Sequence, residues 1–600
     1  MTTVGSLGLR VPPRAVPPAD YHLADAKAAD AWFEALPKTN LGEMARQVFG
    51  ALTQFNRAEL PDSHRIRIAE RFGAAVDYLA ENLQRHFLDT AFPLGEKAEQ
   101  VAALVRELDA ALAVTYKIVI ERILGGIHEA DDQRQLTIAL NRAMRYLARS
   151  LYRAVLVYKP WPANAWREMH AIYAFARMDG LARLPVREQL DDSNSPAQTL
   201  DDFYRQAIVL AAAEPQRLRQ REMAAVFENG LRWGKALAIG AAENAEVKPT
   251  HLLIDLSADK EPLLVERLSD PTKARFLLVD LEPAGQALGA ELAKSSADAP
   301  QGASKQLVAN LLRRLAEEWS QPATRRFPRT RLVFELRVLV GLSAIHGELA
   351  TRASTPHKPR REPPPHLSQE SVAYALAPLG LNLLTSEPES PGPREQPIAW
   401  KSEERPAPTA GSTPTTVTLR TSNESAGGYC IEWYAHNAPR IRVGEVLGIQ
   451  SVHDDLQFSI ALIRWIQHAT QDSLRVGVEL IAPQCRAANS YVGDLRAVRE
   501  RRSLKTEPAL LLPAAPAASQ PPTVLLPTIK HKPDDVIWLY SESADQLVRL
   551  GELVDATGAC SRFAFEVLQE SARGKPAKQA RPAGESPGDR PDFDNLWSNL

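Results

Sequence analysis

Apolar residues recur at helical spacing through the first half of the chain. Between residues 66 and 88 they lie three or four positions apart, at Ile68, Phe72, Val76, Leu79, Leu83 and Phe87. Only a period near 3.6 residues places such positions on one face, so this spacing predicts an amphipathic helix. The same pattern covers residues 41–57, 98–124, 136–156, 164–179, 200–212 and 303–319. We therefore expect residues 21–320 to form an all-α bundle or an irregular helical array.

Two short apolar runs, 251–256 and 276–281, interrupt this helical region. Each has an aspartate near its end, Asp255 and Asp280. The simpler interpretation is a pair of buried strands that end at exposed turns. A metal or phosphate site built from the two carboxylates is the alternative, and it is weaker because no glycine-rich loop accompanies them.

The second half of the chain changes from helical to strand-like patterning. Arginines gather at 325–331 and lead into an apolar, β-branched run up to residue 349. Short apolar runs then follow within 417–434 and 442–480, separated by Gly, Asn, Asp and Ser. Strands at roughly ten-residue spacing with such turns are typical of a small antiparallel barrel.

The region 505–570 contains a smaller set of elements. Residues 536–540 and 561–567 have strand patterns, and 543–556 has a helical one. We expect a small α/β appendage there. The last residues, Phe593, Leu596, Trp597 and Leu600, would share one helical face, which indicates either a docking helix or a frayed terminus.

Proline marks the connections between these parts. The 45 prolines gather at 11–18, 356–414 and 508–533, and such stretches favour extended linkers. The chain is thus expected to be an α+β multidomain protein with six segments. They are a disordered N-terminus (1–20), a helical domain (21–320), a barrel (325–350 plus 415–495), a Pro-rich insertion (351–414), a small C-terminal module (505–570) and a flexible tail (572–600).

Composition and missing motifs exclude several classes of function. With 71 Lys+Arg against 73 Asp+Glu, no global positive charge attracts nucleic acid. Three cysteines without CxxC spacing argue against a disulfide framework, and no apolar stretch approaches the ~20 residues of a membrane helix. No HExxH, GxSxG or Walker-A motif occurs. We expect a cytoplasmic protein without membrane insertion, metal ligands, cofactor or catalytic residues.

Two short motifs in the barrel region resemble a known family. Arg325-x-x-x-Arg329 precedes a strand pattern, and Asn423-x-Ser425-x-x-Gly428 follows later. Together with the runs 460–466 and 476–480, they resemble the PilZ domain, a small β-barrel that binds the bacterial second messenger cyclic di-GMP. The resemblance implies a ligand site formed by Arg325, Arg326, Arg329, Asn423, Ser425 and Gly428. In this chain residues 351–414 separate the two motifs, and we interpret them as a loop insertion, since long surface insertions cost little.

The chemistry of these residues suits a cyclic dinucleotide. Arginine binds phosphate through two parallel hydrogen bonds and can also stack on a purine. Asn423 and Ser425 offer short side chains for a guanine edge or a phosphate, and Gly428 permits close backbone approach. No nucleophile is paired with a base, so the site is expected to bind without reacting.

The sequence therefore predicts a non-enzymatic bacterial effector that binds cyclic di-GMP and signals through an unidentified protein partner. The alternative is a degenerate, ligand-free PilZ scaffold in motility, pilus or polysaccharide machinery, and a weaker one is an enzyme with its site in the helical region. The RxxxR pattern alone is weak, because Arg183/Arg187 and Arg217/Arg221 also satisfy it, and these are expected on solvated helices.

Overall fold

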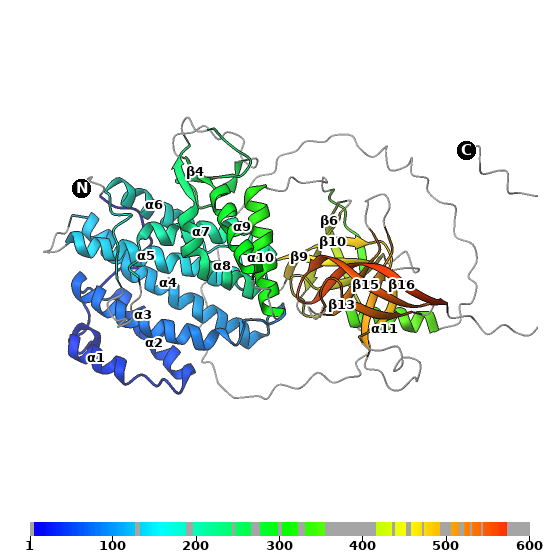
Figure 1. Ribbon diagram of the computed structural model, residues 1–600. Coiled ribbons are helices and arrows are strands. Elements are labelled where there is room, and N and C mark those ends of the chain that lie inside the picture. Colours follow the sequence, from blue (N-terminus) through cyan, green and yellow to red (C-terminus); the bar gives the residue numbers. More distant parts are fainter. Residues whose placement is uncertain are drawn as a thin grey trace, which may run out of the picture.

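The computed structural model shows a block of helices beside a pair of β-barrels (Figure 1). The described residues are 5–126, 132–187, 196–242, 246–265, 276–297, 303–321, 330–354, 416–425, 427–434, 439–451, 458–470, 473–492, 506–514, 521–527, 531–541 and 544–572. The expected insertion at 351–414 and the tail at 572–600 fall almost entirely outside these ranges. Among the described residues, no helix is long and apolar enough to cross a lipid bilayer.

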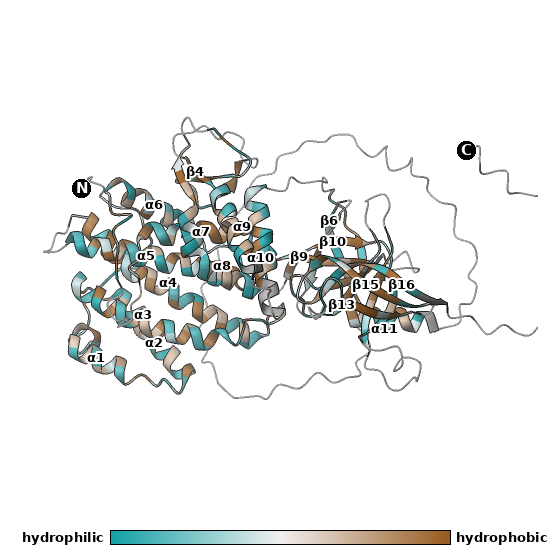
Figure 2. Ribbon diagram, in the orientation of Figure 1, coloured by the Kyte–Doolittle hydropathy of each residue, from teal (hydrophilic) through white to brown (hydrophobic). Residues whose placement is uncertain are grey.

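The helical block forms as the periodicity predicts. Apolar and polar residues alternate around its helices (Figure 2), and the apolar face of α3 buries Ile68, Phe72 and Val76 completely. All seven expected helices are present, and α1, α8 and α9 are additional. Their bounds are α1 Ala26–Glu34, α2 Leu41–Arg57, α3 Asp62–Gln84, α4 Glu96–Leu124, α5 Asp132–Val155, α6 Ala165–Met178, α7 Leu200–Ala212, α8 Gln220–Trp233, α9 Glu282–Ala297 and α10 Ala303–Ser320.

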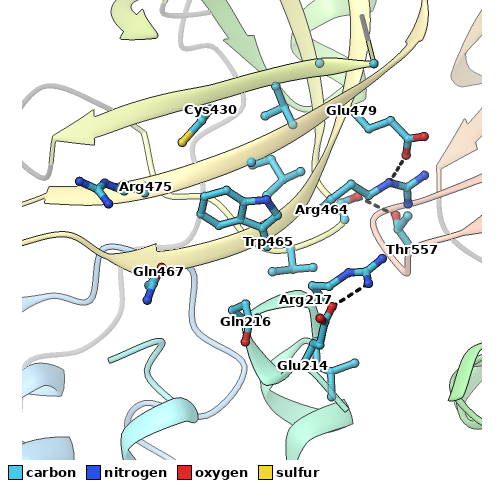
Figure 3. Close-up of a pocket in the computed structure, with 18 of the residues that line it drawn as sticks. Glu214, Gln216, Arg217, Cys430, Arg464, Trp465, Gln467, Arg475, Glu479 and Thr557 are labelled. Carbon is cyan, nitrogen blue, oxygen red and sulfur yellow. Dashed lines mark hydrogen bonds and ion pairs between the residues drawn. The ribbon is translucent and has the colours of Figure 1, made fainter. Parts of the chain in front are cut away.

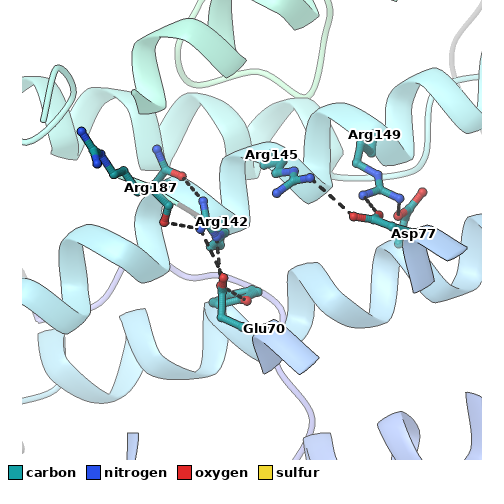
Figure 4. A network of polar contacts seen from close by, with 9 residues as sticks. Glu70, Asp77, Arg142, Arg145, Arg149 and Arg187 are labelled. Atoms are coloured by element: carbon teal, nitrogen blue, oxygen red, sulfur yellow. Dashed lines mark hydrogen bonds and ion pairs between the residues drawn. The ribbon is translucent and has the colours of Figure 1, made fainter. Parts of the chain in front are cut away.

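Ion pairs link the central helices of the block (Figure 4). Arg142 on α5 contacts Glu70 on α3 at 2.9 Å, and Arg149 contacts Asp109 on α4 at 2.8 Å as well as Asp77. These arginines are almost completely buried, so an unpaired charge at either position would be costly. The carboxylates offset that cost and so fix α3, α4 and α5 relative to one another.

The N-terminal segment differs from the prediction. Residues 5–20 were expected to be disordered, but they lie along the helices, with Leu9 buried. The Glu121 carboxylate accepts hydrogen bonds from the backbone N–H groups of Leu7 and Leu9 at 3.2 and 2.8 Å. Ala15 pairs with Ala58 through a parallel bridge. These contacts involve Glu121 and Ala58, which are distant in sequence, so the composition of residues 5–20 does not reveal that this segment is ordered.

The two apolar runs with aspartates are strands, as expected. They lie in a four-stranded sheet of order β1-β4-β2-β3, formed by β1 Ala238–Ala241, β2 His251–Asp255, β3 Leu263–Leu264 and β4 Phe276–Asp280. Because β2 and β4 are antiparallel, Asp255 is opposite Phe276 and Asp280 is opposite His251. The two carboxylates are therefore at opposite ends of the strand pair and cannot share a metal ion.

The first barrel joins two distant pieces of the chain. It is a closed barrel of order β10-β7-β6-β5-β8-β9, and all neighbouring strands in it are antiparallel. β5 lies between β6 and β8, with Arg337 opposite Thr418. The long insertion therefore separates strands that are neighbours in space. The strands are β5 Glu335–Val340, β6 Val417–Ser425, β7 Gly428–Tyr434, β8 Val446–Ser451, β9 Ser459–His468 and β10 Ser473–Ala482.

The expected α/β appendage is wrong, because the C-terminal region is a second closed barrel of order β11-β12-β13-β16-β15-β14. Residues 544–556 form strand β15 instead of a helix, and Val548 is opposite Val567 of β16. Cross-strand pairing outweighs the helix-forming residues of this stretch. The strands are β11 Arg486–Tyr491, β12 Glu507–Leu512, β13 Thr523–Pro527, β14 Val536–Tyr540, β15 Ala544–Ala556 and β16 Cys560–Ala572. β11 falls within the range expected for the first barrel but belongs to the second.

Direct contacts hold the three parts together. Helix α11, Leu342–Ser354, packs Leu342 and Ile345 into an apolar cluster that both barrels share. The helical block meets the first barrel where Phe92 and Ile441 exchange backbone hydrogen bonds of 2.8 and 2.7 Å. The helical block and the two barrels consequently form a common junction.

Candidate functional site

The Asn-Ser-Gly motif lies on the β6–β7 hairpin of the first barrel. Asn423 and Ser425 are at the end of β6, and Gly428 begins β7 directly opposite Ser425. The Ser425 hydroxyl donates to the Gly428 carbonyl at 3.3 Å. A register shift just before Asn423 bends the strand locally, as bulges do next to many sites.

Gly428 is required by a close backbone approach. A Cβ added at this position would lie 1.9 Å from the carbonyl oxygen of Val478 on β10, and the residue has φ +153. No side chain fits in that space, so the hairpin turn lies directly against β10.

The chain that precedes the first barrel strand runs beside this hairpin. Thr330 and Glu424 exchange backbone hydrogen bonds of 2.8 and 2.9 Å, so Thr330 is opposite the residue between Asn423 and Ser425. The Thr421 hydroxyl donates to the Leu332 carbonyl at 2.8 Å and further fastens this segment. The sequence-predicted Arg325, Arg326 and Arg329 lie outside the described residues, but Arg329 is the residue immediately before Thr330.

A cavity of about 970 Å³ opens at this place, and all three parts of the protein line it (Figure 3). The first barrel contributes Asn423, Ser425, Gly428, Arg464 and Trp465. The helical block contributes residues of α10 and of the short helix η2, Pro215–Arg217, and the second barrel contributes residues 555–557. The structure thus brings together three of the six predicted site residues on one cavity wall.

Some of the arginines that line the cavity pair with carboxylates. Arg464 contacts Glu479 at 2.5 Å (Figure 3). It also contacts Asp555 of the second barrel at 2.8 Å. Burial disfavours its charge, but these two carboxylates together raise the pKa of Arg464. Arg217 pairs with Glu214 at 2.8 Å. Within the part of the chain that the structure describes, Arg219, Arg331 and Arg475 also line the cavity and form no ion pair.

Two tryptophans of the barrel have different positions. Trp433 is fully buried and its indole N–H donates to the Pro439 carbonyl at 3.0 Å, as expected for a core residue. Trp465 lines the cavity instead, with its ring against Gly477, its cross-strand neighbour. A Cβ on Gly477 would lie 1.8 Å from the indole nitrogen, so this glycine makes room for the ring.

The cavity has the chemistry of a binding site. The described residues contain no group of three His, Cys, Asp or Glu side chains that could hold a metal ion. Burial raises the pKa of the nearby Cys560 thiol to about 11, which disfavours a nucleophilic thiolate. Arginine, amide, hydroxyl and indole groups instead suit recognition of a phosphate and a planar base.

The cavity residues outside the first barrel could not be identified from the sequence. Arg217 lies in the short helix η2 and is exposed, as expected, but it also lines the cavity, whereas Arg221 on α8 does not. No local pattern distinguishes these two arginines, because the cavity exists only where separate domains meet.

Comparison with known proteins identifies the family. Residues 27–243 match the family model described as "Cyclic-di-GMP receptor FimW, N-terminal domain", and 251–375 and 380–487 match its "middle PilZ domain". Residues 495–568 match the "FimW C-terminal beta-barrel domain". No solved structure matches the chain.

A curated relative extends this similarity over the whole length. The Cyclic-di-GMP receptor FimW of Pseudomonas aeruginosa is 28% identical over 624 residues, which cover 99% of each chain. The three family models match in their proper order and together span most of the sequence. The chain therefore belongs to the FimW family, with a helical N-terminal domain, a PilZ domain in the middle and a C-terminal β-barrel.

Proposed function

We propose that this protein is a non-enzymatic receptor for cyclic di-GMP and that the dinucleotide binds in the cavity at the domain junction. One observation carries the proposal: the hairpin with Asn423, Ser425 and Gly428 lines the cavity beside Thr330, the residue after Arg329. The curated relative is named as a receptor for the same ligand. The cavity, about 970 Å³, is at the upper end of the range of small-molecule sites.

Each predicted residue has a role that its chemistry supports. Arg325 and Arg329 would bind phosphate oxygens through paired hydrogen bonds, and Arg326 would add charge beside them. Asn423 and Ser425 are half-buried in the cavity wall and would bind a guanine edge or a phosphate. The Trp465 ring offers a face on which a guanine can stack.

Signalling would follow from the shared position of the cavity. The helical block, the PilZ barrel and the C-terminal barrel all line it, so a ligand there has different affinities for different arrangements of the three. Binding would hold the segment of Arg325–Arg329 against the cavity and shift the helical block relative to the barrel. An unidentified protein partner would recognise that change.

Titration calorimetry on the full chain tests the proposal. Wild type should bind cyclic di-GMP, and Arg329→Ala and Asn423→Ala should each weaken binding roughly 10- to 150-fold, as expected for a lost hydrogen bond to a charged ligand. Lys401→Ala is a matched control, since Lys401 and Arg405 repeat the spacing of the arginine pair but are followed by Pro406 and Pro408 in the sequence. Absence of heat with the wild type would overturn the proposal in favour of a ligand-free scaffold.

A further inference from the structure

Arg219 of the helical block contacts one turn of each barrel. It directly precedes α8, and its guanidinium lies over two glycine turns, one in each barrel. A Cβ added at Gly558 would lie 2.0 Å from Nη1, and one at Gly444 would lie 3.1 Å from Nη2. Both glycines have positive φ, +72 and +84. The Arg219 Nε also donates to the Val443 carbonyl at 3.2 Å.

The charge of this guanidinium has no carboxylate bound to it among the described residues. Glu222, the third residue of α8, accepts from the Arg219 backbone N–H at 2.9 Å through one oxygen. Its other oxygen pairs with Arg314 at 3.0 Å. Burial lowers the pKa of Arg219, and the nearby Glu222 carboxylate only partly offsets the lost solvation. A partly buried cation on a cavity wall attracts an anion.

We infer that Arg219 binds a phosphodiester of the ligand directly, so that the dinucleotide connects the helical block to the PilZ barrel. This inference rests on the proposed function. Cyclic di-GMP has two phosphodiesters, and Arg331, which lines the cavity beside the hairpin, can bind one of them. Arg219 lines the same cavity from the helical block and supplies a second cation for the other phosphodiester.

The competing interpretation is that Arg219 only fastens the two glycine turns. The Thr557 hydroxyl already joins those turns by donating to the Gly444 carbonyl at 2.7 Å. If Arg219 is purely structural, its replacement should weaken the binding of every ligand equally. If Arg219 binds the phosphodiester, the loss of affinity should depend on the charge of that phosphodiester. The two interpretations therefore differ in their response to a neutral ligand analogue.

A cycle of protein and ligand changes separates them. Arg219→Gln retains a donor for the Val443 carbonyl and removes the charge, and Arg219→Lys retains the charge. The control is Arg221→Gln, two residues away on α8, whose side chain is 77% exposed and pairs with Asp89. Each variant is titrated with cyclic di-GMP and with an analogue in which one phosphodiester is a neutral methylphosphonate.

Arg219→Gln should bind cyclic di-GMP roughly 10- to 150-fold more weakly than wild type, and Arg221→Gln should not differ. Wild type should bind the analogue more weakly than cyclic di-GMP. Arg219→Gln should bind both about equally, because the symmetric ligand can turn its neutral linkage toward the missing charge. Arg219→Lys should keep part of the preference.

Two results would overturn the inference while the proposed function stands. One is unchanged affinity of Arg219→Gln for cyclic di-GMP. The other is a weakened variant that still discriminates against the analogue as strongly as wild type does, which would make Arg219 a structural residue. If wild type binds neither ligand, the proposed function fails and the inference fails with it.

Discussion

Replacing Gly428 with alanine should damage the site through the backbone alone. The added Cβ would lie 1.9 Å from the Val478 carbonyl oxygen, whereas real Cβ contacts essentially never fall below 3.0 Å. The hairpin and β10 must therefore separate by about 1.1 Å at this end. β7 and β10 are paired from Gly428 opposite Glu479 to Tyr434 opposite Ser473, so the separation opens the first rungs of this ladder.

The cost can be worked out from those rungs. Losing one or two backbone hydrogen bonds and forcing alanine into a positive φ costs about 2–4 kcal/mol. Amide hydrogen exchange measures local opening, so the amides of β10 near Val478 should exchange roughly 30- to 900-fold faster in Gly428→Ala. Cyclic di-GMP should also bind more weakly, because Asn423 and Ser425 move with the hairpin.

Gly240→Ala is the matched control. Gly240 lies in a strand of the helical block, and a Cβ there has no atom within 4 Å. It should leave both the exchange of β10 and ligand affinity unchanged. If Gly428→Ala behaves like this control, the backbone at Gly428 does not lie against the Val478 carbonyl.

Three further predictions concern the cavity ring, a buried ion pair and a buried histidine. If a guanine stacks on Trp465, Trp465→Ala should weaken cyclic di-GMP binding roughly 5- to 150-fold by calorimetry, and Trp465→Phe should weaken it much less. Equal affinities of wild type and Trp465→Ala would exclude stacking. Lys117→Met should lower the free energy of unfolding by about 3–5 kcal/mol in urea, because it leaves the Glu168 carboxylate buried without its 2.9 Å partner. The exposed Arg67→Met should cost less than about 1 kcal/mol, and similar losses for both would contradict this. Burial lowers the pKa of His170, so the folded protein binds fewer protons than the unfolded chain as pH falls. The neutral, buried His170 therefore contributes its full stability above about pH 6.5. This contribution is lost as pH falls, by at most about 1.4 kcal/mol per pH unit. Urea midpoints from pH 7.5 to 5.5 should depend less on pH in His170→Gln than in wild type or in the exposed His22→Gln, and an unchanged dependence would argue against the buried neutral histidine.

The helices could be predicted because their signal is local. In α3 the apolar positions from Ile68 to Leu83 repeat every three or four residues, and the buried face follows them. The first barrel could also be recognised from its strands and turns, even though β5 and β6 are separated by the long insertion.

The second barrel could not be recognised, because its strands carry conflicting local signals. In β15 the residues Leu547, Leu550 and Leu553 fit helical spacing, while Val548 and Leu550 point into the barrel. Register shifts between Leu547 and Val548 and on either side of Leu553 interrupt the simple alternation that would reveal a strand. Only pairing with β16 decides the structure.

In the candidate site, too, some residues belong to a local sequence motif and others do not. Asn423, Ser425 and Gly428 form a short motif on one hairpin, so its resemblance to a PilZ signature could be recognised from the sequence. Arg219 and Asp555 reach the cavity from other domains and belong to no motif. Their positions follow from contacts between domains, which no local pattern encodes.

Photo-crosslinking can locate the bound dinucleotide in the protein. Full-length protein is irradiated with a cyclic di-GMP that bears an azide on a guanine, and the modified peptides are identified by mass spectrometry. We expect adducts on the β6–β7 hairpin, on the Trp465 strand and on residues 213–222 of the helical block, and we expect unlabelled cyclic di-GMP to prevent them. Adducts that lie only outside these segments, or that excess ligand does not suppress, would contradict a binding site at the domain junction.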